Sequence, residues 1–480
     1  MVLLDELFPY AHIVFRVLTI LYVLTILTSI GVVISENRNP VKSLAWITVL
    51  ILLPVVGFVL YMFFGRSLKS VRMISHRKRR RLRNTDHLPD ATKAQPELDE
   101  ACRSLSSLAS RLVDCPVIPG NEVEIFTGGK QKMEALEADL LAAREYIHLQ
   151  YYIIEDDKIG NRLARILAQK AREGVKVRVI YDHVGSFKLT STYFKRLRKQ
   201  GVEAYPFLKV TFPELANHAN WRNHRKVVVI DGETGYIGGM NIADRYVEGT
   251  KHGSWRDTHL RIRGNAVRAL QYSFAVDWYF MRHELLNVPL KGYDPAAPGD
   301  AMQIVMSGPT DRWSNIAFIF LRALSSARKC VYVQTPYFLP NDSLLRTLQA
   351  VALSGVDVRL MMPRNPDSRL LEFAAHSYIK ECLLSGIKVY FYEPGMLHSK
   401  VIIIDDDFVT TGSTNFDFRS FEHNFECNAL VYGNSFNHRM KAIFLDDQQQ
   451  CTRIILARWK KRRLWRKAVE SVARLMAPIL

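Results

Sequence analysis

The chain carries one set of reactive side chains twice, at the same spacing. The first set is His224, Lys226, Asp231, Gly238, Gly239 and Asn241, and the second is His398, Lys400, Asp405, Gly412, Ser413 and Asn415. In both sets four residues separate Lys from Asp, and six separate Asp from the first Gly. A fixed position matches by chance about one time in twenty, so this paired repeat indicates a functional site.

The residue types suit chemistry on a phosphodiester. Its pentavalent transition state is anionic, and two lysines with two Asn or Ser side chains would hold and neutralise it without a metal ion. A neutral imidazole can attack phosphorus, while a second imidazole can protonate the departing oxygen and later deprotonate the acceptor. Because one histidine cannot do both at once, each set predicts half of one shared site.

Each set also has a structural interpretation. A single His-x-Lys before an apolar run such as 227–230 is more often a strand edge with solvated charges, and only the pairing of two sets disfavours this. Asp231 and Asp405 end such runs, where an Asp commonly binds turn amides. Gly238, Gly239 and Gly412 are expected to serve a tight turn or a close backbone approach.

The two sets resemble the paired HKD motifs of the phospholipase D superfamily. Flanking residues match as well, namely Asn220, Arg222, Asn223 and Arg225 at the first motif and Gly395, Met396, Leu397, Ser399, Asp417, Arg419, Ser420 and Asn424 at the second. The resemblance implies a catalytic group of His224, Lys226, Asp231, His398, Lys400 and Asp405, with Asn241, Asn415 and Ser413 binding the substrate phosphate. It also implies that a downstream carboxylate orients each motif histidine through Nδ1. Glu426 fits that place in the second half and Asp257 in the first.

Weaker repeats surround the motifs and predict the fold. Residues 143–150 recur in similar form at 327–334, and residues 174–179 recur at 355–360. Helical patterns alternate with apolar β-runs, which is typical of an α/β fold with a buried sheet. We expect two pseudo-symmetric phospholipase D-type halves, 116–290 (motif segment 218–245) and 291–450 (motif segment 392–419), that share one central cleft.

The N-terminal region, 1–65, predicts a two-helix transmembrane hairpin. Its two apolar runs, about 13–35 and 44–64, are each long enough to cross a bilayer core of ~30 Å. A buried core hairpin is the alternative, and a cleaved signal peptide fits poorly because a basic n-region and a small-residue cleavage site are lacking. Nine basic residues lie within 66–83, so the positive-inside tendency places everything after residue 65 in the cytoplasm.

The net charge of +18 is concentrated in two segments, since 66–83 contributes +9 and 451–480 contributes +8. We interpret 66–115 as a basic juxtamembrane linker and 451–480 as a basic amphipathic tail, both directed at an anionic membrane surface. Basic clusters also bind nucleic acid, and the tail could instead pack on the catalytic body. The six cysteines include no Cys-x-x-Cys pair, which predicts free thiols and no structural zinc. A lysine beside each motif histidine disfavours any metal centre.

Further segments narrow the resemblance to bacterial cardiolipin synthases. They are 37–57 with Gly65 and Arg66, Thr335 to Pro340, and Ala473 to Pro478, so the similarity covers nearly the whole chain. The resemblance implies phosphatidyl transfer between two phosphatidylglycerol molecules, giving cardiolipin and glycerol through a phosphatidyl-histidine intermediate. His224 would be the nucleophile and His398 the acid and base.

The same resemblance implies a multi-pass protein of the bacterial cell (inner) membrane with a cytoplasmic catalytic domain. It implies neither a cofactor nor a nucleic-acid partner. A hydrolytic phospholipase D, a transphosphatidylase for another headgroup, a nuclease-like phosphodiesterase and a non-catalytic scaffold remain as alternatives. The sequence leaves the oligomeric state unknown.

Overall fold

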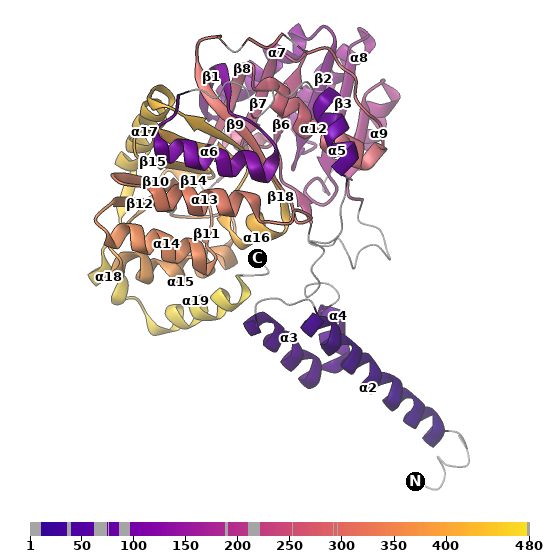
Figure 1. Ribbon diagram of the computed structural model, residues 1–480, viewed down its shortest axis with the longest axis vertical. Coiled ribbons are helices and arrows are strands. Elements are labelled where there is room, and N and C mark those ends of the chain that lie inside the picture. The colour runs from indigo at the N-terminus through magenta and orange to yellow at the C-terminus, as the bar shows by residue number, and fades with distance from the viewer. Residues whose placement is uncertain are drawn as a thin grey trace. The chain divides into compact units, whose positions relative to one another are not determined.

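The computed structural model describes residues 11–35, 40–61, 74, 76–85, 97–187, 191–209, 221–251, 253–290, 292–294 and 296–477 (Figure 1). The described chain forms two compact units. The first contains helices α2 (Ala11–Ser35), α3 (Pro40–Leu52) and α4 (Pro54–Leu60). The second contains all the strands, and both motif sets lie in it.

The N-terminal unit contains one helix that matches an expected membrane span in length and composition. Residues Ile13–Ser35 form a helix long and apolar enough to cross a membrane. The second expected span, 44–64, is instead divided at Leu53 into α3 and α4, and its residues 62–64 lie outside the described part. The division follows from Pro54, which lacks an N–H and disfavours a helical conformation in the residue before it. Val33, Leu50 and Tyr61 pack together, so α2 contacts the helices that follow it.

The second unit begins with two helices and then repeats one arrangement of elements. The leading helices are α5 (His76–Thr85) and α6 (Glu100–Val113). The first half contains β1 (Ile118–Gly128), α7 (Gly129–Ala142), β2 (Tyr146–Tyr151), α8 (Lys158–Arg172), β3 (Lys176–Asp182), α9 (Ser191–Lys199), β4 (Glu203–Phe207), β5 (Arg222–Asn223), β6 (Val227–Ile230), β7 (Thr234–Gly238), α11 (Asp244–Glu248), β8 (Ser254–Gly264) and α12 (Val267–Arg282).

The second half contains the same kinds of element in nearly the same order. They are β9 (Asp300–Ser307), α13 (Asn315–Ser326), β10 (Cys330–Gln334), β11 (Phe338–Leu339), α14 (Asp342–Leu353), β12 (Asp357–Pro363), α15 (Arg369–Leu384), β13 (Lys388–Tyr392), β14 (Gly395–Leu397), β15 (Val401–Ile404), β16 (Phe408–Gly412), β17 (Phe416–Asp417), α16 (Phe418–Glu422), β18 (Asn424–Tyr432) and α17 (Asn434–Gln449). The chain continues into β19 (Cys451–Arg453), α18 (Leu456–Lys460) and α19 (Leu464–Met476).

Strand pairing confirms the expected duplication. The first half has the strand order β4-β3-β2-β6-β7-β8-β1. The second half has the equivalent order β13-β12-β10-β15-β16-β18-β9. Antiparallel pairing of β1 with β9 joins the two sheets. The motif strands β6 and β15 lie in the interior of these sheets and are buried along their whole length, which is why they read as unbroken Val and Ile runs.

Two short strands cross between the halves and position the motif histidines. Strand β5 of the first half pairs in parallel with β18 of the second, and β14 of the second half pairs in parallel with β8 of the first. The histidine that follows each short strand continues this pairing. The His224 amide donates to the Phe425 carbonyl at 2.9 Å, and the His398 amide donates to the Arg256 carbonyl at 2.7 Å. Each motif histidine is therefore fixed to the opposite half.

Candidate active site

The first motif histidine is held by a carboxylate of the second half. His224 Nδ1 lies 3.0 and 3.1 Å from the two carboxylate oxygens of Glu426. Glu426 is fully buried, and it also accepts hydrogen bonds from the Ser413 hydroxyl and from Asn424 Nδ2. A proton on Nδ1 donated to Glu426 leaves the lone pair on Nε2, which is the nitrogen a nucleophile or general base must present.

The second motif histidine is held by a carboxylate of the first half. His398 Nδ1 lies 2.6 Å from Asp257 Oδ2, and the Thr258 amide donates to Asp257 Oδ1 at 2.7 Å. The sequence pointed to both carboxylates but assigned each to its own half. That assignment is wrong, because the β5–β18 and β14–β8 pairings place each histidine beside the carboxylate strand of the other half. Neither half can orient its own histidine.

Both motif lysines are buried beside their histidines. Lys226 Nζ donates to the His224 carbonyl at 2.6 Å and lies 5.2 Å from the centre of the Tyr152 ring. Lys400 Nζ donates to the His398 carbonyl and lies 2.8 Å from His398 Nδ1. Burial lowers the pKa of Lys400 to about 8 and holds the pKa of Lys226 well below its usual range. The site thus concentrates cationic groups where a phosphate would have to be neutralised.

Burial also sets the protonation of the histidines and their carboxylates. It lowers the pKa of His224 to about 4 although Glu426 acts in the opposite direction. It likewise lowers the pKa of His398 to about 4, and the nearby Lys400 adds to that effect. Burial raises the pKa of Asp257 and of Glu426, but the facing cations outweigh it and hold both below their usual values. Near pH 7 the pairs are therefore neutral imidazole on ionised carboxylate.

The two motif asparagines face different surroundings. Asn241 Oδ1 accepts from the Ile153 amide at 3.2 Å, and its Nδ2 donates to the Tyr246 hydroxyl at 2.6 Å. Asn415 is also buried, and its Oδ1 has no hydrogen-bond partner among the described residues. A buried amide oxygen without a partner costs free energy, so this atom is suited to accept from a ligand hydroxyl. Phosphate binding by Asn241 and Asn415 stays a prediction.

Comparison with known proteins adds to this geometry. Residues 136–259 and 320–448 match the family model described as "Cardiolipin synthase, PLD-like domain", and residues 18–66 match "Phospholipase_D-nuclease N-terminal". The chain is 41% identical over 470 residues to "Cardiolipin synthase 2" of Bacillus anthracis, covering 94% of this chain and 89% of that protein. The chain belongs to the cardiolipin synthase family.

Another member of the cardiolipin synthase family and one solved structure are also similar to this chain. "Major cardiolipin synthase ClsA" of Bacillus subtilis (strain 168) is 38% identical over 475 residues, covering 96% of this chain and 98% of that protein. The crystal structure of phosphatidylserine synthase from Haemophilus influenzae Rd KW20 aligns with a TM-score of 0.60 at 12% identity, covering 80% of this chain and 98% of that chain. At that identity the likeness shows the shared fold.

The structure agrees with the structural interpretation of the motif aspartates. The Asp231 carboxylate accepts from the backbone amides of Arg144, Glu145 and Tyr146 at 2.7 to 2.9 Å. The Asp405 carboxylate accepts from three consecutive amides in the same way, those of residues 328, 329 and 330, at 2.7 to 2.9 Å. Each lies five residues beyond its lysine, which is about 16 Å along a strand. In this cardiolipin synthase family fold they fix the far end of the motif strand, and a part in the catalytic group stays a prediction.

Ser413 also takes part in structural contacts. Its side chain is fully buried, and its hydroxyl donates to Glu426 and accepts from the Cys427 amide at 2.9 Å. This follows from strand pairing, because β16 runs beside β18 and sets Ser413 next to the carboxylate that β18 carries. Ser413 therefore supports Glu426 in the described structure, and binding of the substrate phosphate by Ser413 stays a prediction.

Three aromatic residues line the histidines and were missed by the sequence analysis. The Tyr152 ring centre lies 4.9 Å from that of His224, edge to face. The Trp255 and Tyr246 ring centres lie 5.3 and 5.7 Å from that of His398. Each of the three lies within a few residues of a strand end, of Asn241 or of Asp257. This proximity is the sequence signal from which they could have been predicted. They pack against the two imidazole rings.

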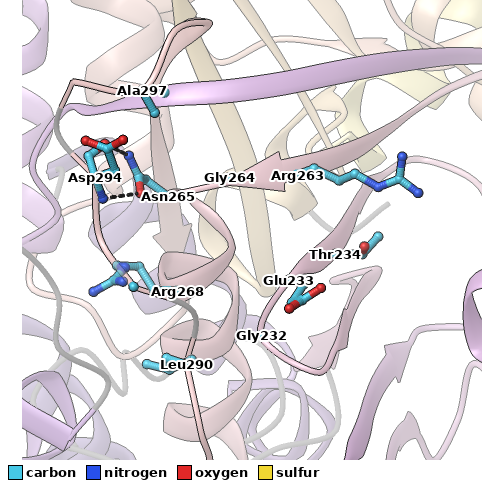
Figure 2. A pocket seen from close by; sticks show the side chains of 12 residues that line it. Gly232, Glu233, Thr234, Arg263, Gly264, Asn265, Arg268, Leu290, Asp294 and Ala297 are labelled. Carbon is cyan, nitrogen blue, oxygen red and sulfur yellow. Dashed lines mark hydrogen bonds between the residues drawn. The ribbon is translucent and has the colours of Figure 1, made fainter. Parts of the chain in front are cut away.

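A separate cavity of about 300 Å³ lies beside the turn that follows Asp231 (Figure 2). Its lining includes Gly232, Asn265, Arg268 and Asp294 and no motif histidine or lysine.

In the described part of the chain, three or more His, Cys, Asp or Glu side chains are nowhere grouped so as to hold a metal ion. The metal-independent site expected from the sequence stays a prediction.

Proposed function

We propose that the protein is a cardiolipin synthase that transfers a phosphatidyl group from one phosphatidylglycerol molecule to another. The observation that carries the proposal is the pair of histidines, each held through Nδ1 by the carboxylate of the opposite half and each beside a buried lysine. Family membership and relatives named cardiolipin synthase over most of the chain support the substrate class, a phospholipid.

In the first step, His224 Nε2 attacks phosphorus and the bond from phosphorus to the glycerol oxygen breaks. A proton from His398 Nε2 goes to the departing glycerol oxygen, leaving phosphatidyl-histidine and a neutral His398. His398 is neutral near pH 7 in the free protein because burial lowers its pKa to about 4. The phosphodiester anion raises that pKa when it binds, so the catalytic proton enters together with the substrate.

In the second step, the terminal hydroxyl of a second phosphatidylglycerol attacks the phosphorus of the intermediate. His398 takes the hydroxyl proton, the bond from phosphorus to His224 breaks, and cardiolipin is released. One phosphodiester replaces another, so no nucleotide is required and the reaction is reversible. Both histidines are 7% exposed, and this burial disfavours water as a competing acceptor.

The assignment of His224 as nucleophile rests on the family resemblance, since the two histidines have equivalent surroundings. It is tested by rapid quenching of the His224→Ala and His398→Ala variants with labelled phosphatidylglycerol. We expect a covalent adduct in His398→Ala and none in His224→Ala. An adduct that appears only in His224→Ala would reverse the assignment.

We also propose a multi-pass protein in the bacterial cell (inner) membrane, with the catalytic unit in the cytoplasm. The apolar helix Ile13–Ser35, the shorter apolar helix Ser43–Leu52 and the nine basic residues within 66–83 support this topology. The partners are then phosphatidylglycerol, cardiolipin and an anionic membrane surface. Nucleic acid is not among them.

Product analysis tests the proposed reaction. Purified protein is incubated with phosphatidylglycerol in mixed micelles containing a chelator and no nucleotide, and the lipids are identified by mass spectrometry. We expect cardiolipin and free glycerol in equal amounts. Phosphatidic acid as the main product would mean a hydrolase, and cardiolipin formed only when ethanolamine phospholipid is added would mean a different donor.

A further inference from the structure

The last helix, α19, turns its polar side toward the protein and its apolar side to solvent. Glu470, Ala473 and Ala477 are buried, and Arg466 and Arg474 are half-buried. The exposed apolar side chains, between 39 and 80% accessible, are Leu464, Trp465, Val469, Val472, Leu475 and Met476. This is the reverse of an ordinary surface helix, which buries its apolar stripe.

The exposed apolar residues form one continuous stripe. At 100° per residue the six side chains cover an arc of roughly 140°, with the small Ala468 inside it. A stripe of this width is as broad as the face that a helix normally packs against a core. Leaving it in water costs free energy in proportion to its area, so the stripe indicates a surface made for an apolar partner.

Ion pairs fix α19 in this orientation. Arg466 Nη2 donates to Glu372 of α15 at 2.8 Å, and Arg474 pairs with Glu381 of the same helix. Arg462 Nη2 donates to the buried Glu470 at 2.9 Å. The helix runs along α15 at the outer edge of the second half (Figure 1). Two carboxylates of α15 form ion pairs with one side of α19. The helix therefore cannot rotate to bury its apolar stripe without breaking these ion pairs.

The preceding segment is anchored in the same way. The Trp459 side chain is buried, with its ring centre 5.3 Å from that of His376 and 6.0 Å from that of Phe391. The Arg462 guanidinium stacks on the indole, 3.4 Å from its ring centre. The tail is therefore a docked part of the catalytic unit. The sequence left open whether it packs on the body or faces a membrane, and this structure allows both at once.

The charges around the stripe select the occupant. Exposed cations precede the helix, namely Arg458, Lys460, Lys461 and Arg463. Glu470 is the single acidic residue of 451–480, and it is buried and paired. The outward surface is thus apolar and cationic, which is the combination that binds the interface of an anionic bilayer. A second copy of the chain fits less well, because a twofold contact would set these cations against their own equivalents.

We propose that the exposed face of α19, with the cations of the segment before it, inserts into the interface of an anionic lipid bilayer and holds the catalytic unit against its substrate. The inference rests on the proposed function only in taking the substrate to be membrane lipid. Because the helix is clamped to α15, insertion orients the whole catalytic unit. The cost of exposing the stripe is recovered when it leaves water.

Depth-dependent quenching tests the proposal independently of activity. The full-length protein, with Cys451→Ser, is labelled with a polarity-sensitive fluorophore at Val472→Cys and placed in nanodiscs containing brominated phosphatidylglycerol. The matched control is Leu353→Cys on α14, since Leu353 is also apolar and 72% exposed. We expect at least twofold quenching at position 472 and none at 353. In brominated phosphatidylcholine discs the quenching at 472 falls by at least half.

Failure takes recognisable forms. An unquenched label at position 472 in phosphatidylglycerol discs, or equal quenching at 353, overturns the proposal. Energy transfer between labels on separate copies without quenching identifies a second chain as the occupant and also overturns it. If the proposed reaction were wrong, phosphatidylglycerol alone would give no cardiolipin while the quenching pattern stayed as expected.

Activity gives a second readout. The variant with Leu464→Ser, Trp465→Ser, Val472→Ser and Leu475→Ser keeps every ion pair of the clamp and removes four of the six apolar side chains of the stripe. We expect a loss of about tenfold in kcat/KM on phosphatidylglycerol vesicles and unchanged turnover of short-chain substrate in micelles. An equal loss in micelles would show a structural defect and contradict the proposal.

Discussion

The two halves of the active site hold their histidines alike but support the carboxylates differently. Glu426 receives the Ser413 hydroxyl, whereas Asp257 faces Gly239 at the equivalent position after the motif strand. The backbone bonds there are the same, since the Gly239 amide donates to the Thr258 carbonyl at 2.9 Å and the Ser413 amide to the Cys427 carbonyl at 3.0 Å. Asp is one methylene shorter than Glu, and its carboxylate occupies the space that the serine side chain fills in the other half.

The groups behind the carboxylates differ as well. Two residues after Asp257, His259 is fully buried, and neither ring nitrogen has a hydrogen-bond partner among the described residues. Asn428 occupies the equivalent place after Glu426 and accepts from the Thr414 hydroxyl at 2.8 Å. Behind its carboxylate, the first half places an imidazole without a hydrogen-bond partner among the described residues, and the second half places a hydrogen-bonded amide. The duplication thus preserved the pairing of histidine with carboxylate while its support diverged.

The largest expected effect tests whether the two halves form a single site. Lys226→Ala and Lys400→Ala should each lower kcat by roughly 10³-fold, because each removes a cation from a water-excluded phosphate site. Membrane insertion and thermal stability should change little by comparison. The measurement is cardiolipin formation by the purified variants under saturating phosphatidylglycerol. If either variant kept about half of the turnover, each half would work alone and the shared-site interpretation would fail.

Two single substitutions, Gly239→Ser and Ser413→Gly, test how differently the two halves support their carboxylates. A Cβ at position 239 would lie 2.2 Å from Asp257 Oδ1, so Gly239→Ser must displace this carboxylate from His398. We expect a loss of roughly 10²-fold in kcat, in line with other losses of histidine-orienting partners. Ser413→Gly removes one hydrogen bond to a charged group, worth about 1.5 kcal/mol, and should cost about tenfold. Gly239→Ala serves as the control for side-chain volume without a hydroxyl.

The opposite ranking would contradict this account. If Ser413→Gly proved the more damaging change, the hydroxyl would act on substrate and not on Glu426 alone. Both variants should retain the native fold by circular dichroism. A shift in the acid limb of the pH profile in Ser413→Gly would report the altered basicity of His224 directly.

The sequence predicted the duplication well because the signal is local. The spacing of His224, Lys226 and Asp231 recurs within one strand and turn, and the apolar runs of the motif strands mark an interior position in a sheet. It could not predict that Glu426 orients His224. That contact depends on β5, a strand of two residues that pairs with β18 some 200 positions away, and so short a strand leaves no periodic pattern.

The motif aspartates and Ser413 show a second limit of prediction from sequence. The sequence pattern of an Asp at a strand end, or of a Ser after a Gly, is the same whether the side chain binds substrate or backbone. Only the start of β2, brought beside Asp231 by antiparallel pairing, reveals the three amides that this carboxylate accepts from. The second apolar run gives a similar case. Its composition predicts apolar helical residues, but it did not predict that the helix is divided before Pro54.

The pH dependence of turnover compares the charged groups of the halves. His224 must be neutral to attack phosphorus, and its pKa is about 4, so kcat/KM should fall as the pH drops through about 4. His398 must bring a proton to the leaving oxygen although its pKa in the free protein is also about 4, so kcat/KM should decline about tenfold per pH unit above about 4. Lys400 must be charged, and its pKa is about 8, so this decline should become steeper as the pH rises through about 8. Lys400→Arg, which stays charged, should lower kcat/KM throughout and remove the steepening above about pH 8. Steepening that persists in this variant would assign it to another group.

The smallest expected effect on chemistry concerns the two motif aspartates, where the halves are most alike. Both adopt a left-handed backbone conformation with φ of 51°, and each carboxylate accepts from three consecutive amides. Asp231→Ala or Asp405→Ala leaves those amides without their acceptor, which costs about 1–3 kcal/mol. We expect a lower thermal midpoint and unchanged turnover per folded molecule.

The matched control for this last prediction is Asp406→Ala in the same turn as Asp405. The Asp406 carboxylate contacts the ammonium groups of Lys329 and Lys441 at 2.7 and 3.0 Å. Partly exposed ion pairs of this kind contribute about 0–1 kcal/mol, so this variant should unfold close to the temperature of the parent protein. A fall in turnover per folded molecule in Asp231→Ala, with Asp406→Ala unaffected, would return the motif aspartate to the catalytic group.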